Sequence, residues 1–163
     1  MPLKTEFDLL RDMKSAARNA PTVHVLMATI CHTLQHRLYG YNWVGFYMLD
    51  PNGTNSLVLG PFVGAQTPHT RIPLNEGICG AAVSQGQTIV VDDVNSDPRY
   101  LACSLETKSE IVAPIRVHGK IVGEIDIDSH DAARFKEDDR KLVESIAEIV
   151  GQYVEQRTPA AGA

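Results

Sequence analysis

The fold is decided by a segment with two strand-like halves, SEIVAPIRVHGKIVGEIDIDS, which occupies residues 109–129. Both halves are rich in Val and Ile, and they meet at His118 and Gly119, a pair that suits a tight turn. The sequence therefore predicts a β-hairpin whose strands run over residues 109–117 and 120–129.

Acidic residues alternate with isoleucines along the second predicted strand. Successive side chains of a strand point to opposite faces, so Glu124, Asp126 and Asp128 share one face. Ile125 and Ile127 take the other face. Three acids on one face indicate either a solvated side of the sheet or the border of a pocket. In a pocket, protonation, solvent or a bound cation must relieve the like-charge crowding.

The pairing of the two strands decides whether Glu110 joins these acids. A two-residue loop would place Ile111 opposite Asp126 and turn Glu110 to the other face. A three-residue loop, with Gly119 in the left-handed conformation and a bulge, would pair Glu110 with Asp128. We favour the bulged form because it leaves the isoleucines on one apolar face and gathers the acids on the other.

Hydrophobic periodicity predicts the other elements. The pattern indicates helices over residues 4–19, 21–40, 77–84 and 137–156 and strands over residues 42–49, 56–63 and 88–92. Residues 64–71 are expected to form a loop, and residues 73–76 and 97–100 are expected to form turns. Together these elements predict an α+β fold, an antiparallel β-sheet with the N- and C-terminal helices on one face and a ligand pocket on the other.

Composition points to one globular domain with a small-molecule partner. The chain has 163 residues, 44% of them hydrophobic, and a formal charge of −5. That charge argues against a nucleic-acid or anionic-membrane surface, and no run of apolar residues is long enough to span a bilayer. We expect a cytoplasmic protein with one domain over residues 1–157 and a disordered tail over residues 158–163.

The three cysteines differ in their predicted surroundings. Cys31 lies in the apolar stripe of a helix, which predicts a packed core thiol. Cys103 lies in a polar loop, and Cys79 lies near the start of a helix, where backbone amides favour a thiolate. The odd number of cysteines argues against a disulfide framework, and no CxxC motif predicts a metal site.

A set of motifs, spread over residues 4–156, resembles the GAF-domain free methionine-(R)-sulfoxide reductases. Each motif is weak alone, but their order and spacing are specific. The motifs are NWVGFY at 42–47, LVLGPF at 57–62, RIP at 71–73, GICG at 77–80, AC at 102–103, SEIV at 109–112 and DIDS at 126–129.

The resemblance implies a GAF fold, commonly homodimeric, that reduces free methionine sulfoxide. It implies cysteine chemistry recycled by a thioredoxin-type reductant, with no metal or organic cofactor. The matching positions are a catalytic thiol at Cys103, a second family cysteine at Cys79, pocket acids at Glu110, Asp126 and Asp128, and an aromatic wall at Trp43 and Tyr47.

These assignments predict a mechanism. Cys103 attacks the sulfoxide sulfur, Glu110 protonates the departing oxygen, and the resulting sulfenic acid condenses with a second thiol. Asp126 and Asp128 bind the substrate ammonium, which explains a preference for the free amino acid. Trp43 packs on the S-methyl group.

Two positions depart from the family pattern. The family usually has another cysteine just before Arg-Ile-Pro, whereas residues 65–70 here read AQTPHT. Resolution of a sulfenic acid would then depend on Cys79 or on an external thiol. Glu124 is an acid where the family tends to be apolar. The missing cysteine keeps an alternative function open, a noncatalytic GAF module that senses or binds a small molecule.

Overall fold

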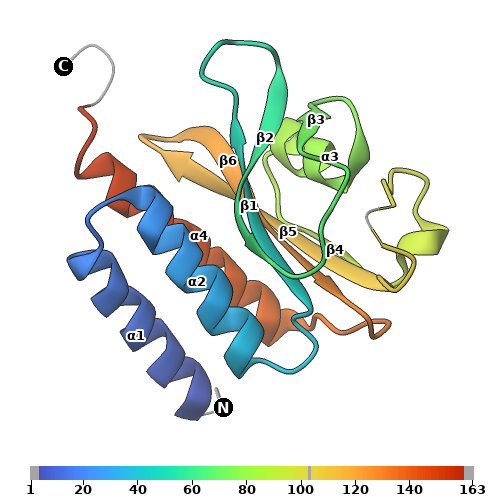
Figure 1. Ribbon diagram of the computed structural model, residues 1–163, viewed down its shortest axis with the longest axis horizontal. Coiled ribbons are helices and arrows are strands. Elements are labelled where there is room, and N and C mark those ends of the chain that lie inside the picture. Colours follow the sequence, from blue (N-terminus) through green and yellow to red (C-terminus); the bar gives the residue numbers. More distant parts are fainter. Residues whose placement is uncertain (1–3, 103, 160–163) are drawn as a thin grey trace.

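The computed structural model describes residues 4–102 and 104–159, which form one curved sheet with helices on both sides (Figure 1). Six antiparallel strands are described, in the order β3-β2-β1-β6-β5-β4. The strands are β1 (Trp43–Leu49), β2 (Ser56–Val63), β3 (Arg71–Pro73), β4 (Ile89–Val91), β5 (Ser109–Val117) and β6 (Lys120–Ser129).

The helices divide between the two faces of this sheet. One face is covered by the N-terminal and C-terminal helices, and we call it the helix face (Figure 1). The other face lies beneath a short helix and the long loops. The helices are α1 (Lys4–Asn19), α2 (Val23–Arg37) and α4 (Glu137–Glu155) on the helix face and α3 (Gly77–Gln85) opposite, with a 3-10 turn η1 (Val94–Ser96). This arrangement confirms the predicted α+β fold.

The predicted elements agree with the observed ones except at β3. Residues 71–73 were expected in a loop and turn, but they pair with residues 56–58 at the edge of the sheet. Three residues are too few to display the alternation that marks a strand in a sequence. Residues 160–163 of the tail that we predicted to be disordered lie outside the described residues.

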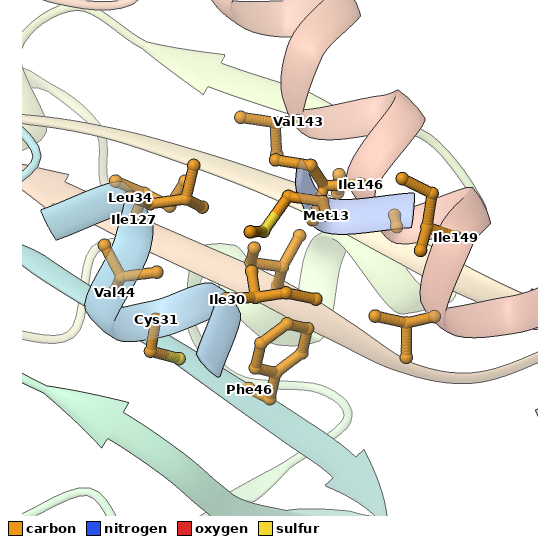
Figure 2. Close-up of a cluster of buried hydrophobic side chains, with 14 of the residues drawn as sticks. Met13, Ile30, Cys31, Leu34, Val44, Phe46, Ile127, Val143, Ile146 and Ile149 are labelled. Atoms are coloured by element: carbon orange, nitrogen blue, oxygen red, sulfur yellow. The ribbon is translucent and has the colours of Figure 1, made fainter. Parts of the chain in front are cut away.

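Apolar side chains from both layers interlock on the helix face. Val44 and Phe46 of β1 and Ile127 of β6 lie against Ile30 of α2 and Ile146 of α4, all fully buried (Figure 2). Burying such side chains is the main favourable term in the free energy of folding. The helix face is therefore a conventional apolar core.

Cys31 belongs to this core, as its position in the sequence predicts. Its side chain is fully buried, and its Sγ lies 3.6 Å from the Pro61 carbonyl oxygen (Figure 2). Burial raises the pKa of the Cys31 thiol to about 12. Cys31 is thus a packing residue rather than a nucleophile.

The β5–β6 hairpin has the predicted register. Glu110 pairs with Asp128 and Val112 pairs with Asp126, so all three acids point to the face opposite the helices. Ile127 pairs with Ile111 on the helix face.

The cause of this register differs from the one we predicted. Val117 pairs with Lys120, so the loop has two residues, His118 and Gly119, and both have positive φ angles of 49° and 78°. Such a two-residue turn matches the natural twist of a hairpin. The extra residue is Val122 in β6, because the register shifts between the Arg116–Ile121 and Ile115–Gly123 pairs. The bulge therefore lies within the strand and not in the loop.

Candidate active site

Four buried carboxyl groups lie on the sheet face opposite the helix face. Glu110 comes from β5, and Glu124, Asp126 and Asp128 come from β6. Their side chains are at most 4% exposed. We call the surface formed by these four residues the acid face. Their burial excludes the interpretation of a solvated side of the sheet.

Strand β1 supplies an aromatic wall beside the acid face. Trp43 pairs with Asp128, and Tyr47 pairs with Glu124. Between them, Gly45 pairs with Asp126, and a Cβ atom at this glycine would overlap the Trp43 ring. The missing side chain at Gly45 thus allows the indole to lie along the strand. Both aromatic residues have the position that the sequence predicts.

The same aromatic residues anchor the loop that follows β2. The Trp43 Nε1 donates a hydrogen bond to the Ala65 carbonyl at 3.0 Å, and the Tyr47 hydroxyl donates one to the His69 carbonyl at 2.7 Å. The His69 ring, through Nε2, lies 3.0 Å from the Ala102 carbonyl oxygen. These contacts join the loop over residues 64–70 to the segment before β5. Sequence reasoning did not identify His69, because its contacts join two loops that carry no periodic pattern.

A small cavity remains between these loops and the sheet. Its volume is about 80 Å³, and both Trp43 and Asp128 line it. Asn42, Thr107 and His130 contribute polar groups to its wall. A molecule in this cavity would therefore meet an aromatic ring on one side and a buried carboxyl on the other.

Helix α3 brings Cys79 onto the acid face. The start of this helix packs closely because Gly80 has no side chain, and a Cβ atom there would lie 2.8 Å from the Leu74 carbonyl oxygen. The Cys79 Sγ donates a hydrogen bond to Asp126 Oδ2 at 3.4 Å. Sγ and one carboxylate oxygen each of Glu110 and Asp126 lie within 4.8 Å of one another.

The environment of Cys79 opposes a thiolate. Burial raises the pKa of the Cys79 thiol well above its ordinary value, and the charges of Asp126, Glu124 and Glu110 raise it further. The expectation that the helix N-terminus favours a Cys79 thiolate is therefore wrong, because desolvation and three nearby acids outweigh the helix dipole.

The acids themselves titrate as a cluster. Burial raises the pKa of Glu110 well above its ordinary value, and the charges of Asp126 and Asp128 add to this effect. Burial, and to a lesser extent the charge of Asp126, also raises the pKa of Asp128 well above its ordinary value. Burial also raises the pKa of Glu124 and of Asp126. Carboxyl groups in such a cluster share protons instead of ionising together.

The ion pairs of the described residues include none of these four acids. Within the same part of the chain, both Glu124 carboxylate oxygens, Asp126 Oδ1 and Asp128 Oδ1 have no hydrogen-bond partner. Buried polar atoms are normally paired, so four unpaired oxygens on one face call for a partner such as water, a cation or a polar ligand.

The structure thus places six of the seven predicted site residues around one face. These are Cys79, Glu110, Trp43, Tyr47, Asp126 and Asp128. The seventh, Cys103, lies outside the described residues. Glu124 was predicted to share this face but was not assigned to the site.

Comparison with known proteins agrees with this geometry. The GAF domain family matches residues 22–154. A free methionine-R-sulfoxide reductase from Escherichia coli is 37% identical over 153 residues, covering 90% of this chain and 90% of that protein. The chain belongs to the GAF-domain free methionine-R-sulfoxide reductase family.

Two further members of this family extend the comparison. A free methionine-R-sulfoxide reductase from Saccharomyces cerevisiae is 40% identical over 124 residues, covering 76% of this chain and 68% of that protein. The crystal structure of the Neisseria meningitidis free methionine-R-sulfoxide reductase in complex with its substrate superposes with a TM-score of 0.87. It is 32% identical, and the match covers 93% of this chain and 90% of that one.

Among residues 4–102 and 104–159, no helix has the length and apolar character that crossing a bilayer requires.

Proposed function

We propose that this protein reduces free methionine-R-sulfoxide to methionine by thiol chemistry. The observation that carries the proposal is the acid face, a group of buried carboxyls beside an aromatic wall and a cysteine, in a chain similar to enzymes of this name. A buried carboxylate is costly unless a cation or hydrogen bonds compensate it. The α-ammonium of a free amino acid would supply that cation.

Asp126 and Asp128 are the proposed partners of the ammonium. Asp128 lines the cavity directly, and each aspartate has one oxygen without a partner among the described residues. A methionine within a peptide has an amide in place of the ammonium, so it could not neutralise these groups. This difference accounts for a preference for the free amino acid.

Trp43 is the proposed contact for the S-methyl end of the substrate. Its ring is 8% exposed and stacks on Phe62 with the ring centroids 5.5 Å apart. An indole held in this way offers a rigid apolar surface at little cost in side-chain entropy. Tyr47 also belongs to the aromatic wall, and its ring centroid lies 6.2 Å from that of Trp43.

The proposed chemistry begins with attack by the Cys103 thiolate on the sulfoxide sulfur. Glu110 delivers a proton to the oxygen, so that one thiolate, one sulfoxide and one proton yield a sulfenic acid and methionine. A second thiol then condenses with the sulfenic acid, which forms a disulfide and releases water. Cys79 or an external thiol fills this role, and a thioredoxin-type dithiol reduces the disulfide.

A coupled assay tests this proposal. We would measure NADPH consumption with a thioredoxin system and racemic free methionine sulfoxide, and we expect turnover to stop at half of the racemate. The Cys103→Ser variant should be inactive, whereas Cys31→Ala should retain turnover because Cys31 lies in the helix-face core. Turnover by Cys103→Ser at the rate of the unchanged protein would overturn the catalytic assignment.

Thiol titration distinguishes the enzyme from a noncatalytic GAF module. Free thiols are counted before and after addition of stoichiometric methionine sulfoxide without reductant. Loss of two thiols per chain supports a Cys103–Cys79 disulfide, and loss of one supports a sulfenic acid that no thiol of the chain resolves. No loss of thiols, together with tight binding of the amino acid, would support the noncatalytic module.

The proposal includes a homodimer in the cytoplasm. Size-exclusion chromatography with light scattering tests the oligomeric state, and a monomer at micromolar concentration would contradict the dimer. Fractionation of the source cells tests the location.

A further inference from the structure

Three buried side chains from three different elements bring metal-binding atoms together on the acid face. They are the Cys79 thiol of α3, the Glu110 carboxyl of β5 and the Asp126 carboxyl of β6. One donor atom from each lies within 4.8 Å of the others, and none of the three side chains is more than 5% exposed. We propose that these residues bind one Zn²⁺ ion, which blocks the acid face.

A second, independent observation supports a cation at this place. Glu124 is fully buried, and neither of its carboxylate oxygens has a hydrogen-bond partner among the described residues. It lies on the same face as Asp126, two residues before it along β6, and its charge is close enough to raise the pKa of the Cys79 thiol. No ion pair of the described residues brings a Lys, Arg or His to the acid face. Buried acids without a cationic partner are typical of metal sites.

The donor atoms favour zinc over other common divalent ions. Mg²⁺ and Ca²⁺ prefer oxygen donors throughout, whereas Zn²⁺ accepts thiolate and carboxylate together. Three protein donors leave the fourth tetrahedral position for a water molecule. When the metal binds, the Cys79 proton and any proton on the two carboxyls pass to solvent, because metal ligands are deprotonated.

The sequence does not predict this site, because its ligands are far apart along the chain. Cys79 precedes Glu110 by 31 residues (110 − 79) and Asp126 by 47 (126 − 79). The three proposed ligands therefore form no short motif with metal-ligand spacing. The β5–β6 register and the docking of α3 bring the three donors together.

Metal binding and substrate binding would compete. Glu110 and Asp126 are also the groups that we assign to the sulfoxide oxygen and the substrate ammonium, and this consequence rests on the proposed function. The metal site itself does not, because it can be measured without substrate or turnover. Zn²⁺ would act as a reversible inhibitor that a chelator removes.

Cobalt absorption provides the direct test. Co²⁺ is titrated into the reduced, full-length protein, and a thiolate-to-cobalt charge-transfer band in the near ultraviolet reports a sulfur ligand. Zn²⁺ is then titrated to displace the cobalt and to give its affinity. We expect one site per chain, with the band lost in Cys79→Ser and kept in Cys103→Ser, a matched thiol-to-hydroxyl control.

Two carboxyl variants refine the assignment. Glu110→Gln removes a ligand and should weaken zinc binding by more than the ~10–100-fold typical of an outer-shell change. Glu124→Gln removes an outer partner and should weaken it by about 10–100-fold. Circular dichroism and thermal melting show that each variant is folded.

The outcomes separate this proposal from the proposed function. A folded protein without the charge-transfer band overturns the zinc site, as does a band that survives Cys79→Ser or disappears in Cys103→Ser. Binding of zinc by a protein without reductase activity supports the site and contradicts the proposed function. Reductase activity that is unchanged when the metal site is saturated with Zn²⁺ or Co²⁺ overturns the predicted inhibition.

Discussion

The two faces of the sheet are built from the same strands but bury opposite chemistry. On the helix face, Val44, Phe46 and Ile127 pack against apolar helices. On the acid face, the alternate residues of those strands include Asp126 and Asp128, which are buried beside Trp43. Burial of the apolar side chains on the helix face is favourable, whereas burial of the four acids, among apolar neighbours such as Val112 and Ile78, carries a desolvation penalty. The difference indicates that the first face maintains the fold and that the second is kept for binding.

Replacement of Phe46 should produce the largest loss of stability. The side chain is fully buried between β1 and the helices, and Phe46→Ala should lower the free energy of unfolding by about 3–5 kcal/mol. Urea denaturation followed by circular dichroism measures this loss. Phe46→Leu keeps most of the volume and should lose much less. An Ala variant as stable as the unchanged protein would show that the helix face does not hold the fold.

Replacement of Asp128 should affect activity and not stability. Asp128→Asn removes one proposed partner of the substrate ammonium, which should cost roughly 2–5 kcal/mol in kcat/KM. Its stability should stay the same or rise, because the change removes one of four crowded acids. Steady-state kinetics and thermal melting are measured on the same preparation. Glu144→Gln, an acid-to-amide change at an exposed position of α4, is the control; it removes only an exposed ion pair with Arg140 and should leave activity unchanged and stability nearly so.

If Asp128→Asn lost stability in proportion to activity, the acid face would have a structural role. The comparison between the two faces would then fail.

A change at Glu124 should stabilise the protein. Glu124 is buried with no hydrogen-bond partner for either oxygen among the described residues, and an unsatisfied buried polar group costs about 1–3 kcal/mol. Glu124→Leu should therefore raise the free energy of unfolding by roughly 1–3 kcal/mol when a chelator is present. Glu124→Gln keeps an unpaired polar group and should gain less. A Leu variant that is less stable than the unchanged protein would show that the Glu124 carboxyl makes a stabilising interaction in the folded chain.

The sequence predicted the two-faced character of the sheet because period-two alternation is a local property. Ile125 and Asp126 are adjacent, so their opposite orientation follows from the strand alone. The pairing of Glu110 with Asp128 was also predicted, but its cause was not, because a bulge at Val122 leaves no mark among the surrounding apolar residues. Likewise, the high pKa of Cys79 depends on its burial and on three acids from other elements, and its position in a helix reveals neither.

The tertiary contacts also explain what sequence reasoning missed at β3 and His69. Strand β3 has three residues, and its pairing with β2 depends on the geometry of the sheet edge. His69 contacts Ala102 across a gap of 33 residues. Neither contact produces a periodic pattern, so neither could be predicted from spacing.

The smallest expected effect concerns an acid that does have a cationic partner. Asp50, at the end of β1, forms an ion pair with Arg71 at 2.7 Å and accepts hydrogen bonds from Thr54 and the Asn52 amide. The Thr54 hydrogen bond, the Asn52 amide and Arg71 lower the pKa of Asp50 to about 2. A lowered carboxyl pKa contributes stability above the unfolded value near 3.8, and this contribution is lost as the pH falls toward 2.

Asp50→Asn should therefore lower the melting temperature slightly at pH 7 and by less at pH 2, where the carboxyl is largely protonated in the unfolded chain and partly so in the folded one. Because the Arg71 side chain is 53% exposed, salt partly screens the pair, and the difference should shrink at high ionic strength. Thermal melting at both pH values, with and without added salt, measures the effect. An equal loss at pH 2 and pH 7 would assign the role of Asp50 to turn geometry instead of charge. An acid without a cationic partner and an acid with one thus predict changes of opposite sign, since removal of Glu124 stabilises the chain and removal of Asp50 destabilises it.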